Sequence, residues 1–307
     1  MLEIAIMIEG QNGLTWRRWQ NIAAAVEELG FAGLYRSDHF TNAEGPDKDS
    51  LECWTSLTWL ASHTKRIEFG PLVSPVSFRV PALTARMAAA VDDLSGGRLT
   101  LGLGAGWQER EHNLFGLDLL DLKSRFVRFE EGLEVITRLL KSEQPVSYEG
   151  NYFHLREASL LPRAGRAGGP RILIGGNGEK RTLRLAARYA DEWNAVFQTP
   201  AGFRHLSAKL DEWLSDEGRK PEEVRRSMMT GIRFAQKRAG LEDKLHGRTV
   251  EDLRGKGMII GVGEEILPQL AGLEQAGVQR VMLQWMELED LEGLEGLSRV
   301  VGGIGNG

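Results

Sequence analysis

Residues 91–116, VDDLSGGRLTLGLGAGWQEREHNLFG, contain a helix end, a turn, a strand and a glycine-rich loop in close succession. Residues 92–95 close the helix and Gly96-Gly97 make the turn. Residues 99–103 alternate too little in polarity for a half-exposed strand, so they are predicted to form a strand buried on both faces. The small residues of the loop at 104–107 let a flat ligand approach the backbone closely. Because ligands bind at the carboxyl ends of parallel strands, the stretch predicts either a ligand site or a tight turn that packs a helix on a sheet.

Strand and helix signals alternate along the rest of the chain. Thr15 can cap the first helix and Gly30 can end it. Eight strand–helix pairs predict an α/β fold, a (β/α)8 TIM barrel, which we expect to be a single domain over residues 1–307. The predicted strands are 2–8, 33–35, 67–69, 99–103, 171–174, 192–196, 227–235 and 280–284, and the predicted helices are 15–29, 51–62, 81–94, 123–140, 180–189, 201–214, 264–275 and a last one from 288.

Two insertions interrupt this repeat. Residues 145–155, PVSYEGNYFHL, are predicted to form a hairpin that turns at 149–151. The second insertion, 237–263, carries a helix-like stretch around 249–253. We expect insertions at the carboxyl-terminal face of the strands, where barrels place lids and substrate walls, although the hairpin is as readily a decoration. The glycine-rich end GGIGNG is predicted to be a frayed tail.

The composition is that of an ordinary globular protein. Of 307 residues 42% are hydrophobic and 26% are charged, and a formal net charge of -5 argues against nucleic-acid binding. No stretch approaches the roughly 18 apolar residues of a membrane span, and Met1 leads almost directly into a strand, so we expect a cytoplasmic protein that does not bind membranes. The single cysteine, Cys53, excludes an internal disulfide.

Three further segments follow predicted strands, namely SDHF at 37–40, GPLVSP at 70–75 and GGNG at 175–178. Together with the opening stretch they resemble the luciferase-like monooxygenase superfamily, particularly its branch that uses the deazaflavin coenzyme F420. The matching pieces are SDHF, then RVPALTARMAAAVDDLSGGRLTLGLGAGWQEREHNLFG, then ILIGGNGEKRTLRLAARYADEWN. The second piece is the most specific, because helix, turn, strand and loop recur in one register. The resemblance implies an oxidoreductase with a small-molecule substrate, and a possible homodimer.

Asp38 and His39 stand where a predicted barrel strand ends, so their side chains can face the mouth of the barrel. Imidazole titrates nearest neutrality, which makes His39 the candidate catalytic residue that gives or takes a proton beside the cofactor ring. Asp38 is a candidate hydrogen-bond partner of that ring. The alternatives are that His39 only shapes the pocket and that Asp38 caps a turn.

The resemblance adds candidate cofactor contacts at two other strand ends. It implies a non-proline cis peptide between Leu72 and Val73, in a bulge that supports the back of the cofactor ring. A trans strand end followed by a turn at Pro75 is the alternative. It also implies contacts at Ala105, Gly106 and Glu111, in the loop that follows residues 99–103.

Gly175, Gly176, Asn177 and Gly178 precede the helix predicted from residue 180. Backbone N–H groups at a helix start, aligned with the helix dipole, bind anions, and glycines let a phosphate come close. These four residues are therefore candidates for binding the cofactor phosphate. A structural glycine turn is the alternative reading.

Glu109, Glu111 and His112 suggest a metal site or a carboxylate pair at first sight. On a helix, however, Glu109 and Glu111 do not share a face, which weakens the idea of a pair. The other histidines are scattered along the chain. The sequence therefore predicts no metal site.

The leading hypothesis is an oxidoreductase that passes a hydride between coenzyme F420 and a small organic substrate. Sugar-phosphate dehydrogenases of the resembled superfamily carry a tryptophan a few residues after DHF and an acid at the position of Trp107, so that activity is not expected here. An FMN-dependent luciferase-like monooxygenase is the alternative. A non-catalytic flavin-binding protein is the alternative from another class, and it would bind reduced cofactor without consuming it.

Overall fold

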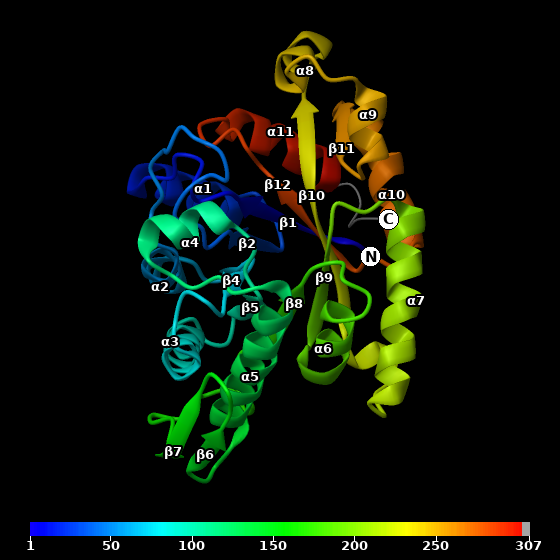
Figure 1. Cartoon of the computed structure of the whole chain (residues 1–307). Helices are drawn as coiled ribbons and strands as arrows, with labels where there is room; N and C mark the ends of the chain where they lie inside the picture. Colours follow the sequence, from blue (N-terminus) through cyan, green and yellow to red (C-terminus); the bar gives the residue numbers. More distant parts are fainter. Residues whose placement is uncertain (303–307) are drawn as a thin grey trace.

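A ring of parallel strands with helices packed around it makes up the computed structural model, which describes residues 1–302 (Figure 1). The strand order is β3-β2-β1-β12-β10-β9-β8-β5-β4, and β3 meets β5 again through a bridge between Phe69 and Leu99. The predicted TIM barrel is therefore confirmed. The barrel strands are β1 (Glu3–Ile8), β2 (Gly33–Arg36), β3 (Glu68–Pro71), β4 (Ser74–Pro75), β5 (Thr100–Gly104), β8 (Arg171–Gly175), β9 (Glu192–Val196), β10 (Arg225–Ala235) and β12 (Arg280–Gln284).

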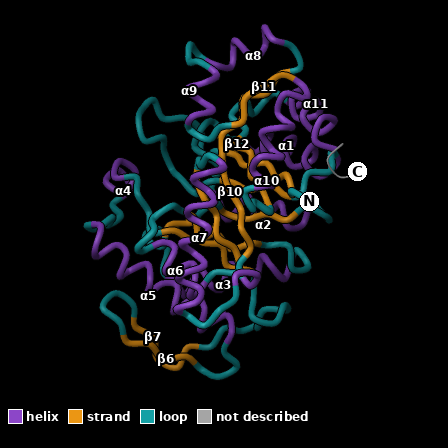
Figure 2. Tube along the Cα trace, turned by 90° about the vertical axis from the view of Figure 1, so that its right-hand side faces the viewer, coloured by secondary structure: helices purple, strands orange, loops and turns teal. Residues whose placement is uncertain are grey.

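Helices cover the outside of the ring (Figures 1 and 2). Thr15 caps the first of them by accepting a hydrogen bond from the backbone N–H of Arg18, as predicted. The helices are α1 (Trp16–Glu28), α2 (Cys53–His63), α3 (Pro81–Leu94), α4 (Glu109–Phe115), α5 (Leu122–Lys141), α6 (Thr182–Tyr189), α7 (Pro200–Asp216), α8 (Arg238–Leu245), α9 (Val250–Gly255), α10 (Leu267–Gln275) and α11 (Leu291–Val301), with short 3-10 turns η1 (Pro221–Glu223) and η2 (Gly263–Ile266).

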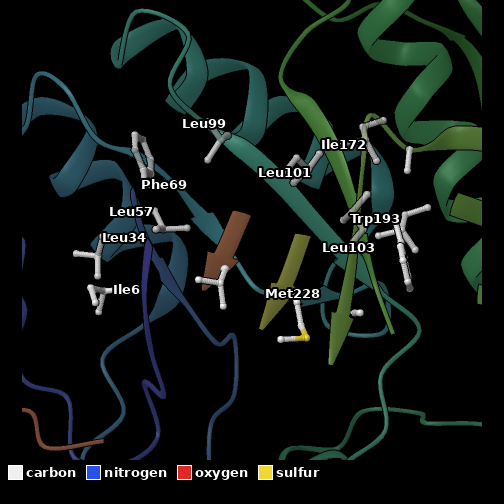
Figure 3. Packing of buried hydrophobic residues seen from close by; sticks show 14 of the residues in the cluster. Ile6, Leu34, Leu57, Phe69, Leu99, Leu101, Leu103, Ile172, Trp193 and Met228 are labelled. Atoms are coloured by element: carbon white, nitrogen blue, oxygen red, sulfur yellow. The ribbon is translucent and has the colours of Figure 1, made fainter. Parts of the chain in front are cut away.

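Alternate side chains of each barrel strand enter two different cores. In β1, Ile4, Ile6 and Ile8 point outward into the large core between strands and helices, whereas Ala5 and Met7 point into the barrel. Figure 3 shows the outer core, where Leu101 and Leu103 of β5 lie near Ile172 and Trp193. All five residues of β5 are buried, as predicted for a strand covered on both faces.

Glycines allow the barrel to close between β3 and β5. A Cβ atom at Gly70 would collide with the carbonyl oxygen of Thr100, and one at Gly102 would collide with that of Pro71. Because backbone atoms cannot move aside as a flexible side chain can, only a residue without a side chain fits at these two positions. The glycines therefore bring β5, and the loop that follows it, against the end of β3.

The amino-terminal end of the barrel interior is filled by charged side chains around Arg280. Its guanidinium donates to Tyr35 Oη at 2.6 Å, to Glu3 Oε2 at 2.9 Å and to Glu68 Oε2 at 2.6 Å. Glu192 lies 3.6 Å from Arg280 Nη1, and burial raises the pKa of the Glu192 carboxyl. These groups come from five different strands and hold them together.

The first insertion lies at the opposite end of the barrel from the one we expected. β6 (Val146–Glu149) and β7 (His154–Ala158) form the predicted hairpin, but it connects α5 to β8 and so lies where the strands begin (Figure 1). Glu131 of α5 accepts hydrogen bonds from the backbone N–H groups of Asn151 and Tyr152, each at 2.8 Å. The hairpin is therefore a decoration of α5 and not a wall of the mouth.

The second insertion does lie beyond the carboxyl ends of the strands, but the prediction of one helix there was incomplete. It contains α8, α9 and a short strand, β11 (Ile259–Val262), that pairs in parallel with Ile232–Ala235 of β10. β10 is long enough to run past the barrel rim, and a separate small apolar core forms there around Leu241, Leu253 and Ile260. A strand of four residues is too short to show a clear pattern of hydrophobic residues, and its partner, residues 232–235, lies far from it in the sequence.

Several helices begin one to three residues later than predicted, and two of them begin three residues later for local reasons. The helix expected from 264 starts as the 3-10 turn η2 and becomes α10 only at Leu267, because Pro268 fits at an α-helix start but not inside one. The helix expected from 288 begins at Leu291, since Asp290 caps it by accepting from the N–H of Gly293 at 2.8 Å. Within residues 1–302 no helix is both long and apolar enough to cross a membrane. The predicted tail lies outside the described residues, apart from Gly302.

Candidate functional site

His39 and Glu111 meet at the carboxyl-terminal end of the barrel. His39 follows β2, and Glu111 lies in the first turn of α4, after β5. His39 Nδ1 lies 2.8 Å from Glu111 Oε1, while Glu111 Oε2 accepts the backbone N–H of Phe40 at 3.0 Å. The carboxylate is only 1% exposed and the imidazole 15%. The glutamate therefore fixes the ring and main chain of the segment that carries it.

The charge of Glu111 also sets the protonation of His39. Burial alone would lower the pKa of the imidazole, but the hydrogen bond and charge of Glu111, with the charges of Glu9 and Asp38, raise its pKa above the ordinary value. Because Nδ1 faces the carboxylate, it carries the proton of this pair, and Nε2 is the nitrogen left to gain or lose a proton. Trp107 packs edge-on against the same imidazole, with 5.6 Å between ring centroids.

Asp38 lies beside His39, but other side chains of the protein already donate hydrogen bonds to its carboxylate. Ser74 Oγ donates to Asp38 Oδ2 at 2.6 Å, and Arg79 donates to both carboxylate oxygens, at 2.5 Å and 3.2 Å. Arg79 also donates to Glu52 Oε1 at 2.9 Å. This network ties the end of β2 to β4 and α2, and its bidentate arginine makes Asp38 a clamp on the strand ends.

The peptide between Leu72 and Val73 is cis, as the resemblance implied. Leu72 belongs to the interior core of the barrel, and Val73 packs against it. A Cβ atom at Gly104 or Gly175 would meet a methyl group of Val73, at 2.6 Å and 3.1 Å. The isopropyl group therefore lies over the glycines at the ends of β5 and β8.

The glycine loop after β8 is held by its asparagine. Asn177 Nδ2 donates to the carbonyl of Val196 at 2.7 Å, and its Oδ1 accepts the N–H of Val196 at 2.9 Å. The Asn177 side chain thus pairs with β9 and is not free for a ligand. Within residues 1–302, the backbone N–H groups of residues 177–182 donate to no protein acceptor. These donors lie at the start of α6, as an anion site requires.

The glycine loop after β5 is fixed from two sides. Gly106 has φ of +83°, where a side chain is strained, and its carbonyl accepts from Arg125 Nη1 at 3.1 Å. His112 is buried, with Nδ1 2.7 Å from the Gln108 carbonyl and Nε2 2.8 Å from Ser77 Oγ. A carbonyl can only accept, so Nδ1 is the protonated nitrogen and His112 is a packing residue. Ala105 is half-buried between this loop and the outer core.

Sequence reasoning missed Glu9 and its partners. Glu9 directly follows β1 and accepts from Gln284 Nε2 at 2.6 Å and from Gln11 Nε2 at 2.8 Å. The rule that led to Asp38 and His39, a polar residue directly after a strand, applies equally to Glu9. Arg79 left no comparable signal. Within residues 1–302 no group of three His, Cys, Asp or Glu side chains could hold a metal ion.

Residues 3–254 match the sequence model of the luciferase-like monooxygenase family, and the chain belongs to this family. Among its relatives, a 4-hydroxyprotoasukamycin monooxygenase of Streptomyces nodosus subsp. asukaensis is 31% identical over 177 residues, covering 58% of this chain and 46% of the relative. A phthiodiolone/phenolphthiodiolone dimycocerosates ketoreductase of Mycobacterium kansasii is 32% identical over 247 residues, covering 78% of this chain and 64% of the relative. The chain thus spans about half to two thirds of the length of these relatives.

The fold is shared with a solved F420-dependent secondary alcohol dehydrogenase, in complex with an F420-acetone adduct. The TM-score is 0.85 at 19% sequence identity, and 99% of each chain is covered. At this identity the likeness concerns the fold.

Proposed function

We propose that this chain is an oxidoreductase that transfers a hydride between coenzyme F420 and a small organic substrate at the carboxyl end of the barrel. The observation that carries the proposal is the pair of His39 and the buried Glu111, 2.8 Å apart at a strand end. A histidine oriented by a carboxylate, with its other ring nitrogen available, is suited to proton transfer. The relationship to a ketoreductase supports an oxidoreductase.

The site fits a cofactor that has a flat ring and a phosphate. The N–H groups of residues 177–182, which donate to no acceptor within residues 1–302, would hold the phosphate, and the lack of a Cβ at Gly176 and Gly178 keeps the space beside Thr182 open. Val73 and the glycines beneath it would support the ring, with Gly106 at its edge. Because the carboxylate of Asp38 is already bonded to Arg79 and Ser74, its proposed contact with the ring is through its main chain.

The roles of the chain follow from this arrangement. When bound, F420 would supply the hydride chemistry. His39 holds or releases a proton at Nε2, beside the reacting carbonyl or alcohol oxygen of the substrate. Glu111 keeps the imidazole oriented and stabilises its charged form, which favours proton donation near neutral pH. Trp107, whose ring stands at 83° to the imidazole, restricts how the imidazole can turn.

The choice of F420 over FMN rests on the SDHF and GAGWQEREH segments. The second candidate is an FMN-dependent monooxygenase. It is favoured by the 31% identity to a monooxygenase. The two candidates differ in the isolated cofactor that the chain binds, which makes them separable without a known substrate.

The experiment is a calorimetric titration of the purified chain with F420 and FMN side by side. We expect F420 to bind more tightly. Tight binding of FMN without binding of F420 would overturn the proposal in favour of the monooxygenase. Oxidation of reduced F420 by 2-butanone then tests the catalytic role, because His39→Asn should lower kcat about 10²- to 10⁴-fold and leave the F420 Kd nearly unchanged. Binding of reduced F420 without any consumption would identify a carrier.

A further inference from the structure

The chain exposes apolar side chains on and after the helix that carries Glu111. Between residues 114 and 122, LFGLDLLDL, six of nine residues are Leu or Phe, and all six are at least partly exposed. Leu114, Phe115 and Leu122 are 57%, 55% and 56% exposed, and Trp107 is 62% exposed. We call this surface the α4 shelf; it consists of Trp107, Leu114, Phe115, Leu117, Leu119, Leu120 and Leu122.

The α4 shelf is held in place from beneath by two arginines of α5. Arg125 donates to the carbonyl of Leu119 at 3.3 Å and to that of Leu120 at 3.1 Å, and the same guanidinium binds the carbonyl of Gly106. Arg128 Nη2 donates to the carbonyl of Asp118 at 2.7 Å. These hydrogen bonds fix the backbone of the shelf relative to the glycine loop. The fixed backbone holds the leucines of the shelf in their exposed positions.

The shelf begins at the candidate catalytic pair. The ring of Trp107 lies next to that of His39 at 83°, and Phe115 packs on Phe40 with 4.9 Å between ring centroids. Leu114 and Phe115 follow Glu111 by three and four positions, which places them on the helix face that carries the carboxylate. Exposed apolar side chains therefore lie next to His39, the residue assigned to proton transfer, and next to Glu111, which orients it.

Exposed apolar side chains clustered in this way favour binding of an apolar partner, because water leaves both surfaces on contact. A substrate whose reacting carbon lies beside His39 would cover the shelf with the part of the molecule that does not react. Binding energy gathered there would hold the reacting group in place.

We propose that the substrate is an alcohol or ketone with a long aliphatic or aromatic portion, and that this portion lies on the α4 shelf. The inference rests on the proposed function for the position of the reacting group. It deepens that function by naming the substrate class and by assigning Leu114 and Leu122 as specificity residues.

The test uses unbranched 2-alkanones from 2-butanone to 2-decanone as probes, titrated by calorimetry into the chain with and without F420. Affinity should rise about two- to fourfold for each added methylene, as expected for burial of an alkyl chain. In the variant with both Leu114→Ala and Leu122→Ala, 2-decanone should bind at least about tenfold more weakly while 2-butanone is nearly unaffected. The variant with both Val80→Ala and Leu94→Ala is the matched control, since these side chains of the α3 region are 62% and 53% exposed.

Three results would overturn the proposal. The first is an affinity that does not depend on chain length, and the second is an equal loss in the control. The third is a shelf variant in which the dependence of affinity on chain length stays intact while another property changes. Weaker F420 binding would mean that the shelf contacts the cofactor, and a changed sedimentation mass would mean that it contacts a second copy of the chain. A chain-length dependence that persists in a protein unable to bind F420 would support the shelf and remove the redox assignment.

Discussion

The two ends of the barrel use charged side chains in opposite ways. At the amino-terminal end, Arg280 pairs with acids from several strands, and its guanidinium is 1% exposed. At the carboxyl-terminal end, Glu111 is buried just as deeply but binds His39, which keeps one ring nitrogen available. Backbone donors beside α6 are likewise left without protein acceptors there, within residues 1–302.

The difference shows where this fold obtains stability and where it keeps binding capacity. Arg280 and Glu192 are each 1% exposed, so a ligand cannot reach the amino-terminal network, although within residues 1–302 both carboxylate oxygens of Glu192 lack a hydrogen bond. The donors left unpaired at the carboxyl-terminal end lie instead at a strand end, where a ligand can reach them. Substitutions at the amino-terminal end should therefore change the free energy of unfolding and leave cofactor affinity alone. At the carboxyl-terminal end, substitutions in the Gly175–178 loop should do the reverse, whereas those in the Asp38 clamp or the His39–Glu111 pair should also change stability.

The largest effect is expected for Arg280→Met. Removal of the guanidinium leaves Glu3, Glu68 and the buried Glu192 without their common partner, which should cost about 3–5 kcal/mol of unfolding free energy. Urea denaturation measures the loss, and F420 affinity of the folded fraction should be unchanged. Arg171→Met is the control, because Arg171 is 53% exposed and pairs with Glu68 at only 3.6 Å, so about 1 kcal/mol or less is expected. Equal losses in both variants would contradict the account of the network.

The clamp on Asp38 should give the next largest effect. Arg79→Gln leaves a carboxylate that is 2% exposed without its counter-charge, at a cost of about 2–4 kcal/mol in unfolding free energy. Adding Asp38→Asn removes the unpaired charge and should restore part of the loss. If the double variant is as unstable as the sum of the two single variants, the two side chains are not coupled.

Gly178→Val tests the phosphate loop. A Cβ atom at this position would lie 2.8 Å from Thr182 Oγ1 and would crowd the open N–H groups. F420 binding should weaken by about 1–3 kcal/mol, the loss of one or two charge-assisted hydrogen bonds, in a protein that still folds. Gly255→Val, at a glycine with no atom within 4 Å of the added Cβ, is the control. Unchanged affinity in folded Gly178→Val would show that the loop is only a turn.

The smallest effect should be a change in pH dependence. Because Glu111 raises the pKa of His39 in the folded protein, their pairing stabilises the fold fully below the ordinary histidine pKa of 6.5, and this contribution is lost as the pH rises through the folded pKa. Glu111→Gln should therefore be less stable than the unmodified chain at pH 6, and the gap should narrow toward pH 9. Unfolding curves at several pH values give the gap, and a gap that is constant across this range would mean that His39 is not the group involved. His39→Asn should remove the pH dependence of the gap.

The barrel itself could be predicted because its signals are local. Strand, turn and helix recur in order. The Thr15 cap lies directly before the helix that it starts, and the Gly96-Gly97 turn lies directly after the helix that it ends. The strand ends could be predicted for the same reason. Because His39 and the Gly175–178 loop directly follow strands, their position at the carboxyl-terminal end of the barrel could be predicted as well. The cis peptide between Leu72 and Val73 was reached through the family resemblance, since no local signal in those residues requires it.

What could not be predicted depends on contacts between distant residues. Arg79 lies 41 positions from Asp38, and no sequence pattern in either segment indicates that the two side chains form an ion pair. The pairing of Asn177 with Val196 is of the same kind, because an asparagine among glycines is equally consistent with a turn or a ligand. β11 was missed because its partner is the end of a strand longer than the barrel needs.

The hairpin of β6 and β7 has a practical consequence. Glu131 binds the hairpin to α5, and the hairpin lies at the end of the barrel where the strands begin (Figure 1). His39 lies at the opposite end, directly after β2. A chemical attachment in the half-exposed or exposed strand His154–Ala158 would immobilise the molecule with its mouth turned toward the solution. An electrode or a bead could therefore carry the protein in one orientation, with the route by which substrate enters and product leaves kept clear.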